Sequence, residues 1–176
     1  NEEGLREGAS INAIATRARA VFEARITHYI AHGSDADIVD YWHVMIKQMQ
    51  ELQGQYPLAC AAFVYPEEVP LEHHAGNEAQ LSSEVKALEL EVIAKLIAHQ
   101  QVSPSLYSDE ESDDIITNLV KGMKDSSKAH FEVVAAPKDF LESPDIMCSA
   151  AIEIQQRFID FEIQNAAKLL RTISAQ

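Results

Sequence analysis

The sequence is short of basic residues, of cysteines and of long apolar runs, and each shortage excludes a class of protein. Its 176 residues include 14 Lys and Arg against 28 Asp and Glu, which gives a formal net charge of −14. Nucleic-acid affinity comes mainly from Lys and Arg that neutralise phosphates, so we expect no nucleic-acid partner. No run reaches the roughly 18 apolar residues of a membrane-spanning helix. Two cysteines are too few for a disulfide-rich mini-protein.

The residues that are present favour a folded domain. Hydrophobic residues make up 47% of the chain, which is too many for an intrinsically disordered protein. Only six glycines and six prolines interrupt it, and we find no internal repeat. The length suits one domain over residues 1–176 that can bury a sizeable core.

Apolar residues recur with helical spacing along most of the chain, and strand patterns are nearly absent. The sequence therefore predicts an all-α fold, an up-down bundle of about five long helices. The last helix, apolar over a wide arc, is expected to be central. The connection over 56–76 is irregular and contains prolines, with one short helix at 58–63. The long helices are predicted at 5–32, 35–55, 77–101, 108–135 and from 143 almost to the C-terminus.

The two cysteines, Cys60 and Cys148, are 88 positions apart, but the predicted topology brings both to the end of the bundle where the chain begins. A disulfide between them would close a large loop and would imply an oxidising compartment. The alternative is a pair of buried free thiols that pack as small hydrophobic groups.

Two charged residues fall within apolar helix faces. Arg25 lies on the apolar side of the first predicted helix, and Glu162 lies on that of the last, at a similar height. Because an unpaired buried charge is strongly unfavourable, the sequence predicts an internal ion pair between them. Such a pair would fix the register of the helices, or would form a polar spot in a ligand cavity.

Two sets of histidines are candidates for metal binding. His32 and His99 end rising helices on their core-facing sides, and Asp35 and Asp37 lie at the same level. The ordinary alternative is a histidine stabilised by the helix dipole. At the opposite end of the bundle the candidate ligands, which together with the cysteines would make a mixed Cys/His zinc site, are His73, His74 and His130. No C-x-x-C pair supports this site.

The sequence lacks the motifs of the common catalytic sites. We find no glycine-rich phosphate loop, no G-x-S-x-G turn and no paired E-x-x-H set of a di-iron bundle. Both cysteines lie in apolar runs without a nearby Lys or Arg, a setting that does not favour a reactive thiolate. We therefore lean against an enzyme and expect no cofactor.

Three functional hypotheses remain. The first is a non-catalytic binding or sensory domain, most consistent with the bacterial cell envelope; a cytoplasmic location is the alternative. The start at Asn1 rather than Met fits the removal of an upstream signal or anchor, and a chosen boundary fits equally well. The second is an acidic, immunity-type protein that neutralises a basic partner. The third is a metal-binding helical bundle. The sequence identifies neither a protein partner nor a small ligand.

Overall fold

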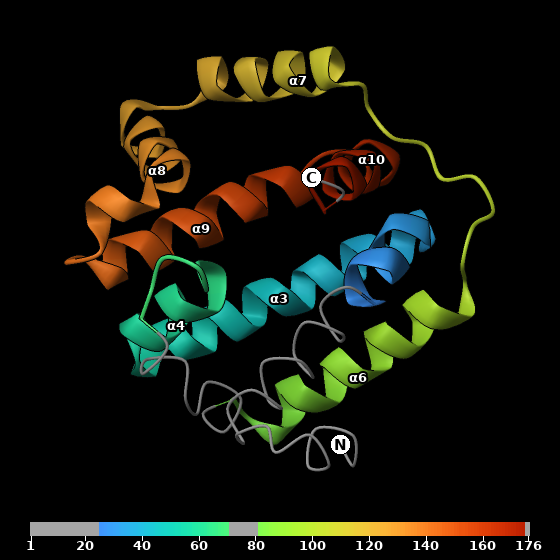
Figure 1. The fold of residues 1–176 in the computed structure, drawn as a ribbon, viewed down its shortest axis with the longest axis horizontal. Coiled ribbons are helices and arrows are strands. Elements are labelled where there is room, and N and C mark those ends of the chain that lie inside the picture. Colours follow the sequence, from blue (N-terminus) through green and yellow to red (C-terminus); the bar gives the residue numbers. More distant parts are fainter. Residues whose placement is uncertain (1–24, 71–80, 175–176) are drawn as a thin grey trace, which may run out of the picture.

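The computed structural model describes residues 25–70 and 81–174, and within these ranges the chain forms helices and no strand (Figure 1). The predicted all-α class is therefore confirmed for the described residues. Residues 25–32 are helical. The elements that follow are α3 (Asp35–Gln55), α4 (Pro57–Val64), α6 (Ser83–Ala98), α7 (Asp109–Gly122), α8 (Asp125–Ala135), the 3₁₀ helix η2 (Pro137–Phe140), α9 (Pro144–Ile159) and α10 (Ile163–Ser174).

Local capping signals fix several helix starts. The Ser34 hydroxyl accepts the Asp37 N–H at 3.3 Å, and α3 has the predicted bounds 35–55. Ser108 and Glu111 form a capping box at the start of α7, each side chain accepting the other residue's backbone N–H. Pro144 opens α9, where its missing N–H is no loss.

The fourth and fifth predicted helices are each broken in two, so the prediction of single helices over 108–135 and from 143 onward is wrong. Met123 adopts an extended conformation between α7 and α8 and is buried. Residues 160–162 separate α9 from α10. The second break has a packing reason: it turns α10 so that it packs against α3 as well as α9.

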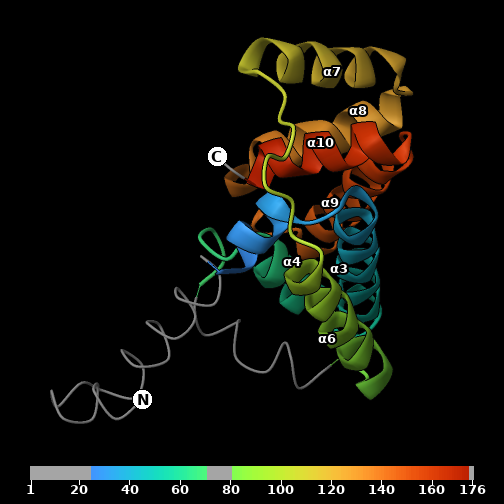
Figure 2. The same ribbon diagram turned by 90° about the vertical axis from the view of Figure 1, so that its right-hand side faces the viewer.

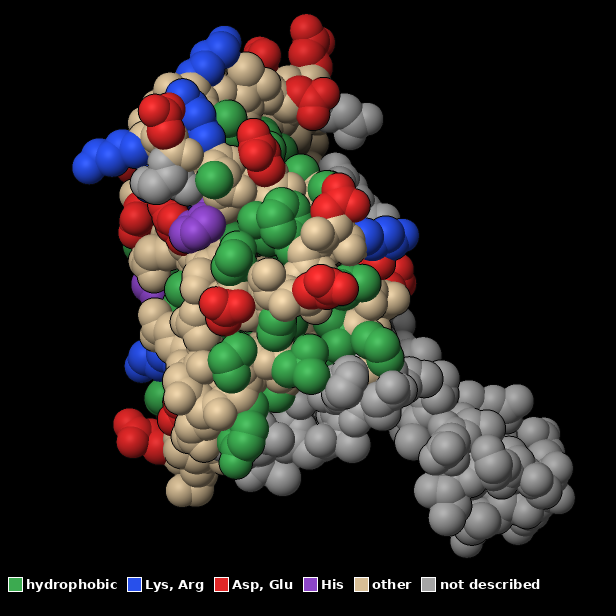
Figure 3. All heavy atoms as spheres, turned by 90° about the vertical axis from the view of Figure 1, so that its left-hand side faces the viewer, with side chains coloured by type: hydrophobic (Ala, Val, Ile, Leu, Met, Phe, Trp, Pro, Cys, Tyr) green, Lys and Arg blue, Asp and Glu red, His purple; other side chains and the backbone are tan. Residues whose placement is uncertain are grey.

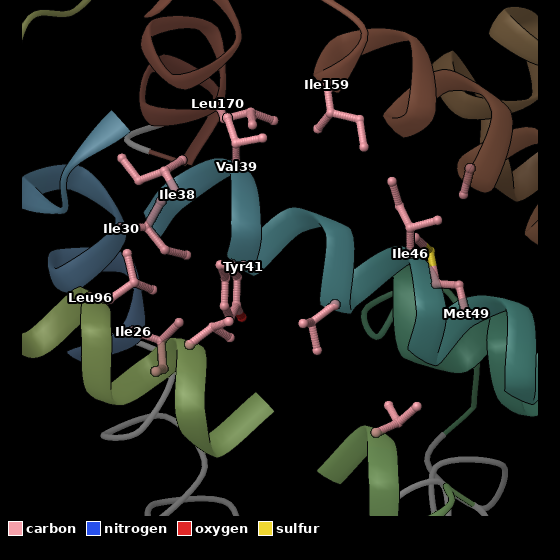
Figure 4. Packing of buried hydrophobic residues seen from close by; sticks show 14 of the residues in the cluster. Ile26, Ile30, Ile38, Val39, Tyr41, Ile46, Met49, Leu96, Ile159 and Leu170 are labelled. Atoms are coloured by element: carbon pink, nitrogen blue, oxygen red, sulfur yellow. The ribbon is translucent and has the colours of Figure 1, made fainter. Parts of the chain in front are cut away.

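The expectation that the last predicted helix is central holds for its first half, because α9 packs against α3, α4, α8, α10 and η2. The other central element is α3. It packs against α4, α6, α9 and α10, as Figure 2 shows. The apolar side chains of its N-terminal half meet those of neighbouring helices (Figure 4). Ile38 and Leu96 are completely buried where α3 meets α6, and Leu170 of α10 is buried in the same cluster.

A second, smaller core lies among α4, α8 and α9. Its buried members include Ala61, Val133 and Met147, and small alanines allow these helices to approach closely. Figure 3 views the side of the molecule on which α4 and α8 lie, and hydrophobic side chains gather in the middle of that face with Asp and Glu among them. Leu141 and Ile146 are the exposed large hydrophobic residues that follow η2 and begin α9.

The helix α7 stands apart from the packed elements (Figures 1 and 2). Among its described side chains only Ser112 is buried. The loop before it is attached to α10 through Tyr107, whose backbone N–H donates to Thr172 Oγ1 at 3.0 Å and whose ring lies 4.0 Å from Lys168 Nζ. Within the described ranges, no helix is both long enough and apolar enough to cross a membrane.

Candidate functional site

The two cysteines meet as predicted. Cys60 of α4 and Cys148 of α9 form a disulfide, their Cα atoms 5.7 Å apart, and both residues are completely buried. The disulfide joins α4 to α9, which are two of the three helices around the second core. A cystine buried in this way is unavailable to a substrate, so it is a structural bond and not a catalytic thiol.

The predicted ion pair between Arg25 and Glu162 is wrong, because both residues are exposed. Glu162 lies in the break between α9 and α10, where its backbone carbonyl accepts the Ala166 N–H at 2.9 Å. The expectation treated α9 and α10 as one helix. A break of three residues changes which side of the following helix faces the core.

The buried cation is Arg171, which the sequence reasoning missed. Arg171 is 1% exposed, and its Nη2 donates to the Gly33 carbonyl oxygen at 2.7 Å and to Asp35 Oδ1 at 2.6 Å. The contact ties α10 to the turn before α3. A signal was present in the sequence: the alternation of apolar and acidic residues over 159–163 does not suit one face of a continuous helix.

The first set of candidate metal ligands does not assemble into a metal site. Its members are His32, His99, Asp35 and Asp37. His99 Nδ1 lies 2.8 Å from Asp37 Oδ2, and the Ser34 hydroxyl donates to the same carboxylate oxygen. Asp35 is instead paired with Arg171. His32 bonds through Nδ1 to the carbonyl of His28, 2.9 Å away. Of the four predicted residues, only Asp37 and His99 meet, and their contact joins α3 to the end of α6.

At the opposite end His130 is held by a carboxylate. His73 and His74 lie outside the described residues. The Nδ1 of His130 is 2.5 Å from Glu153 Oε2, so this histidine pairs with α9 and not with a cysteine. Within the part of the chain that the structure describes, no group of three or more His, Cys, Asp or Glu side chains is placed to hold a metal ion.

Glu153 is the centre of a polar network between α8 and α9. Its Oε1 accepts the Ser127 hydroxyl at 2.5 Å and Arg157 Nη2 at 2.8 Å. The hydrogen bond from Ser127, then that from Arg157, and a smaller contribution from His130 lower the pKa of Glu153 to about 2. Ser, His and Glu are the residue types of a hydrolase triad, but here the serine donates to the glutamate and not to the histidine. The carboxylate that accepts this proton has a pKa of about 2, so it is too weak a base to activate the Ser127 hydroxyl as a nucleophile.

An apolar cavity of about 200 Å³ lies where α3, the end of α4, α8, α9 and α10 converge. Its walls are mostly hydrocarbon, and none of the described residues that line it is charged. The apolar side chains around it include Val64, Val134, Ala151, Ile154, Phe158 and Leu170. The cavity lies beside the disulfide, because Ala151 is one helical turn after Cys148 on α9.

Three polar residues also line this cavity, and each has a buried polar atom that lacks a hydrogen-bond partner among the described residues. They are Trp42 through Nε1, Tyr65 through its hydroxyl and Gln155 through Oε1. They come from α3, from the residue that ends α4, and from α9. Burial raises the pKa of the Tyr65 hydroxyl to about 12, so it remains protonated at neutral pH. Sequence reasoning did not single out these residues, because Trp42 follows the helical spacing of the apolar residues in the predicted helix 35–55, which indicates only core packing.

A second hollow, of about 430 Å³, is open and polar and runs between α3 and α9. Gln53 Nε2 donates to Ser149 Oγ at 2.6 Å within it, and Glu153 and Arg157 line one end. Most of its polar side chains are paired with one another, including Gln156, whose Nε2 donates to Asp160 Oδ1 at 3.2 Å. It therefore offers a bound molecule less than the apolar cavity does.

Some of the acidic residues of the chain lie together on its surface. Glu110, Asp113 and Asp114 are exposed at the start of the outlying helix α7. Exposed carboxylates by themselves do not identify a partner, so the hypothesis of a basic protein partner stays a prediction.

Comparisons of the chain with protein-family models, with curated proteins and with solved structures found no match. No relative therefore supplies a site to which Trp42, Tyr65 or Gln155 can be matched.

Proposed function

We propose that the protein is a non-catalytic domain that binds a small molecule, as a binding or sensory module does. The observation that carries this proposal is the mostly apolar cavity of about 200 Å³, which the side chains of Trp42, Tyr65 and Gln155 help to line. A mostly apolar pocket with a few convergent polar groups is the usual form of a small-molecule site. A molecule of matching shape in this cavity would bury apolar surface of its own and of the wall, so its binding would stabilise the fold.

The disulfide supports a particular compartment. A buried bond between Cys60 and Cys148 persists where the surroundings are oxidising, as in the cell envelope. The proposal therefore includes a location on the extracytoplasmic side of the membrane. Thiol counting under denaturing conditions, on protein isolated from its native source, tests this part. Two reactive thiols before reduction would contradict it.

The cavity itself is tested with an apolar probe, toluene. The chain has one tryptophan, Trp42, and it lines the cavity, so its emission reports on the occupant directly. We expect saturable binding of toluene, with a change in Trp42 emission and a rise in Tm. The Tm rises because a ligand that binds only the folded state stabilises it by RT ln(1 + L/Kd), which grows with the free ligand concentration L.

A cavity-filling variant separates specific from surface binding. Ala151→Leu places three more carbon atoms in the cavity, whereas Ala129→Leu makes the same change at an exposed position of α8. We expect the first variant to lose toluene binding and the second to keep it. Equal binding by both variants, or no saturable binding by the parent protein, would overturn the proposal.

A further inference from the structure

We infer that the occupant of the cavity is an uncharged hydrocarbon-like molecule, one ring with at most a short alkyl group, that places no polar group inside the cavity. This inference rests on the proposed function and specifies the class of its ligand. It comes from three properties of the cavity: the atoms that its wall presents, the lack of charge on its described lining residues, and its volume.

The wall presents carbon atoms even where polar residues form it. Trp42, Tyr65 and Gln155 line the cavity, but the indole Nε1, the tyrosine hydroxyl and the Gln155 Oε1 are each buried from solvent. A polar atom that faced the cavity would be accessible to a water molecule inside it. These residues therefore contribute ring and chain carbon atoms to the wall, and almost all of the surface around the cavity is hydrocarbon.

Such a wall selects against polar and charged groups. The usual small-molecule site adds a few convergent polar groups to an apolar wall, and this cavity departs from that form. A hydroxyl group transferred there loses its hydrogen bonds to water and finds little on the wall to replace them, which is unfavourable. An ion loses more, because none of the described lining residues carries an opposite charge. A hydrocarbon gains by leaving water.

The size of the occupant follows from a comparison with a known apolar cavity. An engineered cavity of about 150 Å³ lined by Leu, Ile and Phe binds benzene. The present cavity is larger, about 200 Å³, so it has room for one such ring with a short alkyl group attached. It is too small for a long acyl chain or a nucleotide, because typical sites for drug-sized ligands begin at about 300 Å³.

The experiment first compares four probes of nearly equal shape: toluene, benzyl alcohol, benzoate and benzylammonium. Binding to the full chain at pH 7 is measured by Trp42 emission and by calorimetry. We expect benzyl alcohol to bind about tenfold or more weakly than toluene, because its hydroxyl group is buried without a partner. We expect no binding of benzoate or benzylammonium at concentrations that saturate toluene binding.

A second pair of probes tests the size limit. Ethylbenzene carries one short alkyl group, and 1,3,5-triethylbenzene carries the same group at three positions of the ring. We expect ethylbenzene to displace toluene from the protein, and triethylbenzene to displace none, because only the first fits a cavity of about 200 Å³. Displacement of toluene by triethylbenzene would overturn the size limit.

Two matched variants test whether the wall offers a ligand only carbon. Tyr65→Phe removes the buried hydroxyl of a lining residue, and Tyr56→Phe removes the hydroxyl of a tyrosine that is 51% exposed. We expect the ratio of the toluene and benzyl alcohol affinities to be the same in both variants as in the parent protein. A selective loss of benzyl alcohol binding in Tyr65→Phe would show that this hydroxyl pairs with a ligand, and would contradict the inference.

The outcomes separate this inference from the proposed function. If benzyl alcohol, benzoate or benzylammonium binds as tightly as toluene or more tightly, the hydrocarbon class is wrong although the cavity still binds a small molecule. If none of the probes binds, the proposed function fails together with the inference. Saturable binding of toluene and ethylbenzene, with the other probes weaker or absent as stated, supports both.

Discussion

Gly33 shows how one small residue sets the distance between helices. It is buried in the turn between the helical segment 25–32 and α3, and its backbone does not adopt the left-handed conformation expected of a C′ glycine. The reason for glycine is close packing. A Cβ at this position would lie 2.5 Å from Leu96 Cδ2 and 3.3 Å from Ile38 Cγ1.

We therefore predict that Gly33→Ala destabilises the protein by about 1–3 kcal/mol, the usual effect of overpacking. Gly54, near the end of α3, is the matched control, because a Cβ there meets nothing within 4 Å. Gly54→Ala should stabilise by about 0.5–1 kcal/mol, because alanine is the better helix former. Urea unfolding of the two variants measures both effects. A neutral Gly33→Ala variant would mean that α6 moves away from the turn at little cost.

Glu153 links the stability of the protein to pH. Its pKa falls from 4.5 to about 2 on folding, because the Ser127 hydroxyl and then Arg157 stabilise the carboxylate. A carboxyl group whose pKa is lower in the folded state contributes stability above its unfolded pKa. That contribution is lost as pH falls through the folded pKa, which places the loss between about pH 5 and about pH 2.

We predict that Glu153→Gln lowers the free energy of unfolding at pH 7 by about 1–2 kcal/mol, and that the difference from the parent narrows below about pH 5. Urea midpoints at pH 7, pH 5 and about pH 2.5 measure it. Glu110→Gln, at an exposed position of α7, is the control and should have little effect at any of these values. A difference that stays constant down to pH 2.5 would show that Glu153 acts only through packing.

At the scale of the elements, the disulfide and the two helix breaks decide how the second half of the chain packs. Cys60 and Cys148 hold α4 against α9 beside the cavity. The break after α9 lets α10 lie on α3, where Arg171 contacts the turn at Gly33. Each of these features joins segments that are far apart in the sequence.

We predict that the double variant Cys60→Ala, Cys148→Ala keeps its helical content but unfolds with about 2–4 kcal/mol less free energy, because the disulfide restricts the unfolded chain. Circular dichroism measures the first property and urea unfolding the second. Adding a reductant should lower the stability of the parent protein toward that of the variant and should not affect the variant. A parent protein that is insensitive to reductant under unfolding conditions would contradict the disulfide.

At the scale of the whole molecule, the net charge of −14 opposes compaction through self-repulsion. Salt shortens the range of this repulsion from about 30 Å at 0.01 M to about 8 Å at 0.15 M. We predict that Tm rises over this range of NaCl concentration.

The double variant Glu110→Lys, Asp113→Lys changes the net charge from −14 to −10, because each replacement removes one negative charge and adds one positive charge. Its Tm should depend less on salt, and an equal or steeper dependence would contradict the repulsion account.

Much of the helical architecture could be predicted from the sequence, because its signals are local. Ser34, Ser108 and Pro144 begin their helices where capping chemistry predicts. The pairing of the cysteines also followed, since topology alone brought them to one end of the bundle. Helix orientation did not follow, because an angular assignment accumulates along a helix and fails after any break. Arg25 and Glu162 were misassigned for that reason, and Arg171 was missed.

The sequence by itself determined the all-α class, the main helix starts, the acidic character and the cysteine pair, because these depend on composition and on interactions within a few residues or on coarse topology. Only the tertiary structure decided that α10 turns away from α9 to pack on α3, that Asp37 pairs with His99, and that Trp42, Tyr65 and Gln155 line one cavity. The physical reason is that a cavity and its unpaired polar atoms are properties of the space between helices. That space depends on how several helices pack at once, and no single stretch of sequence encodes it.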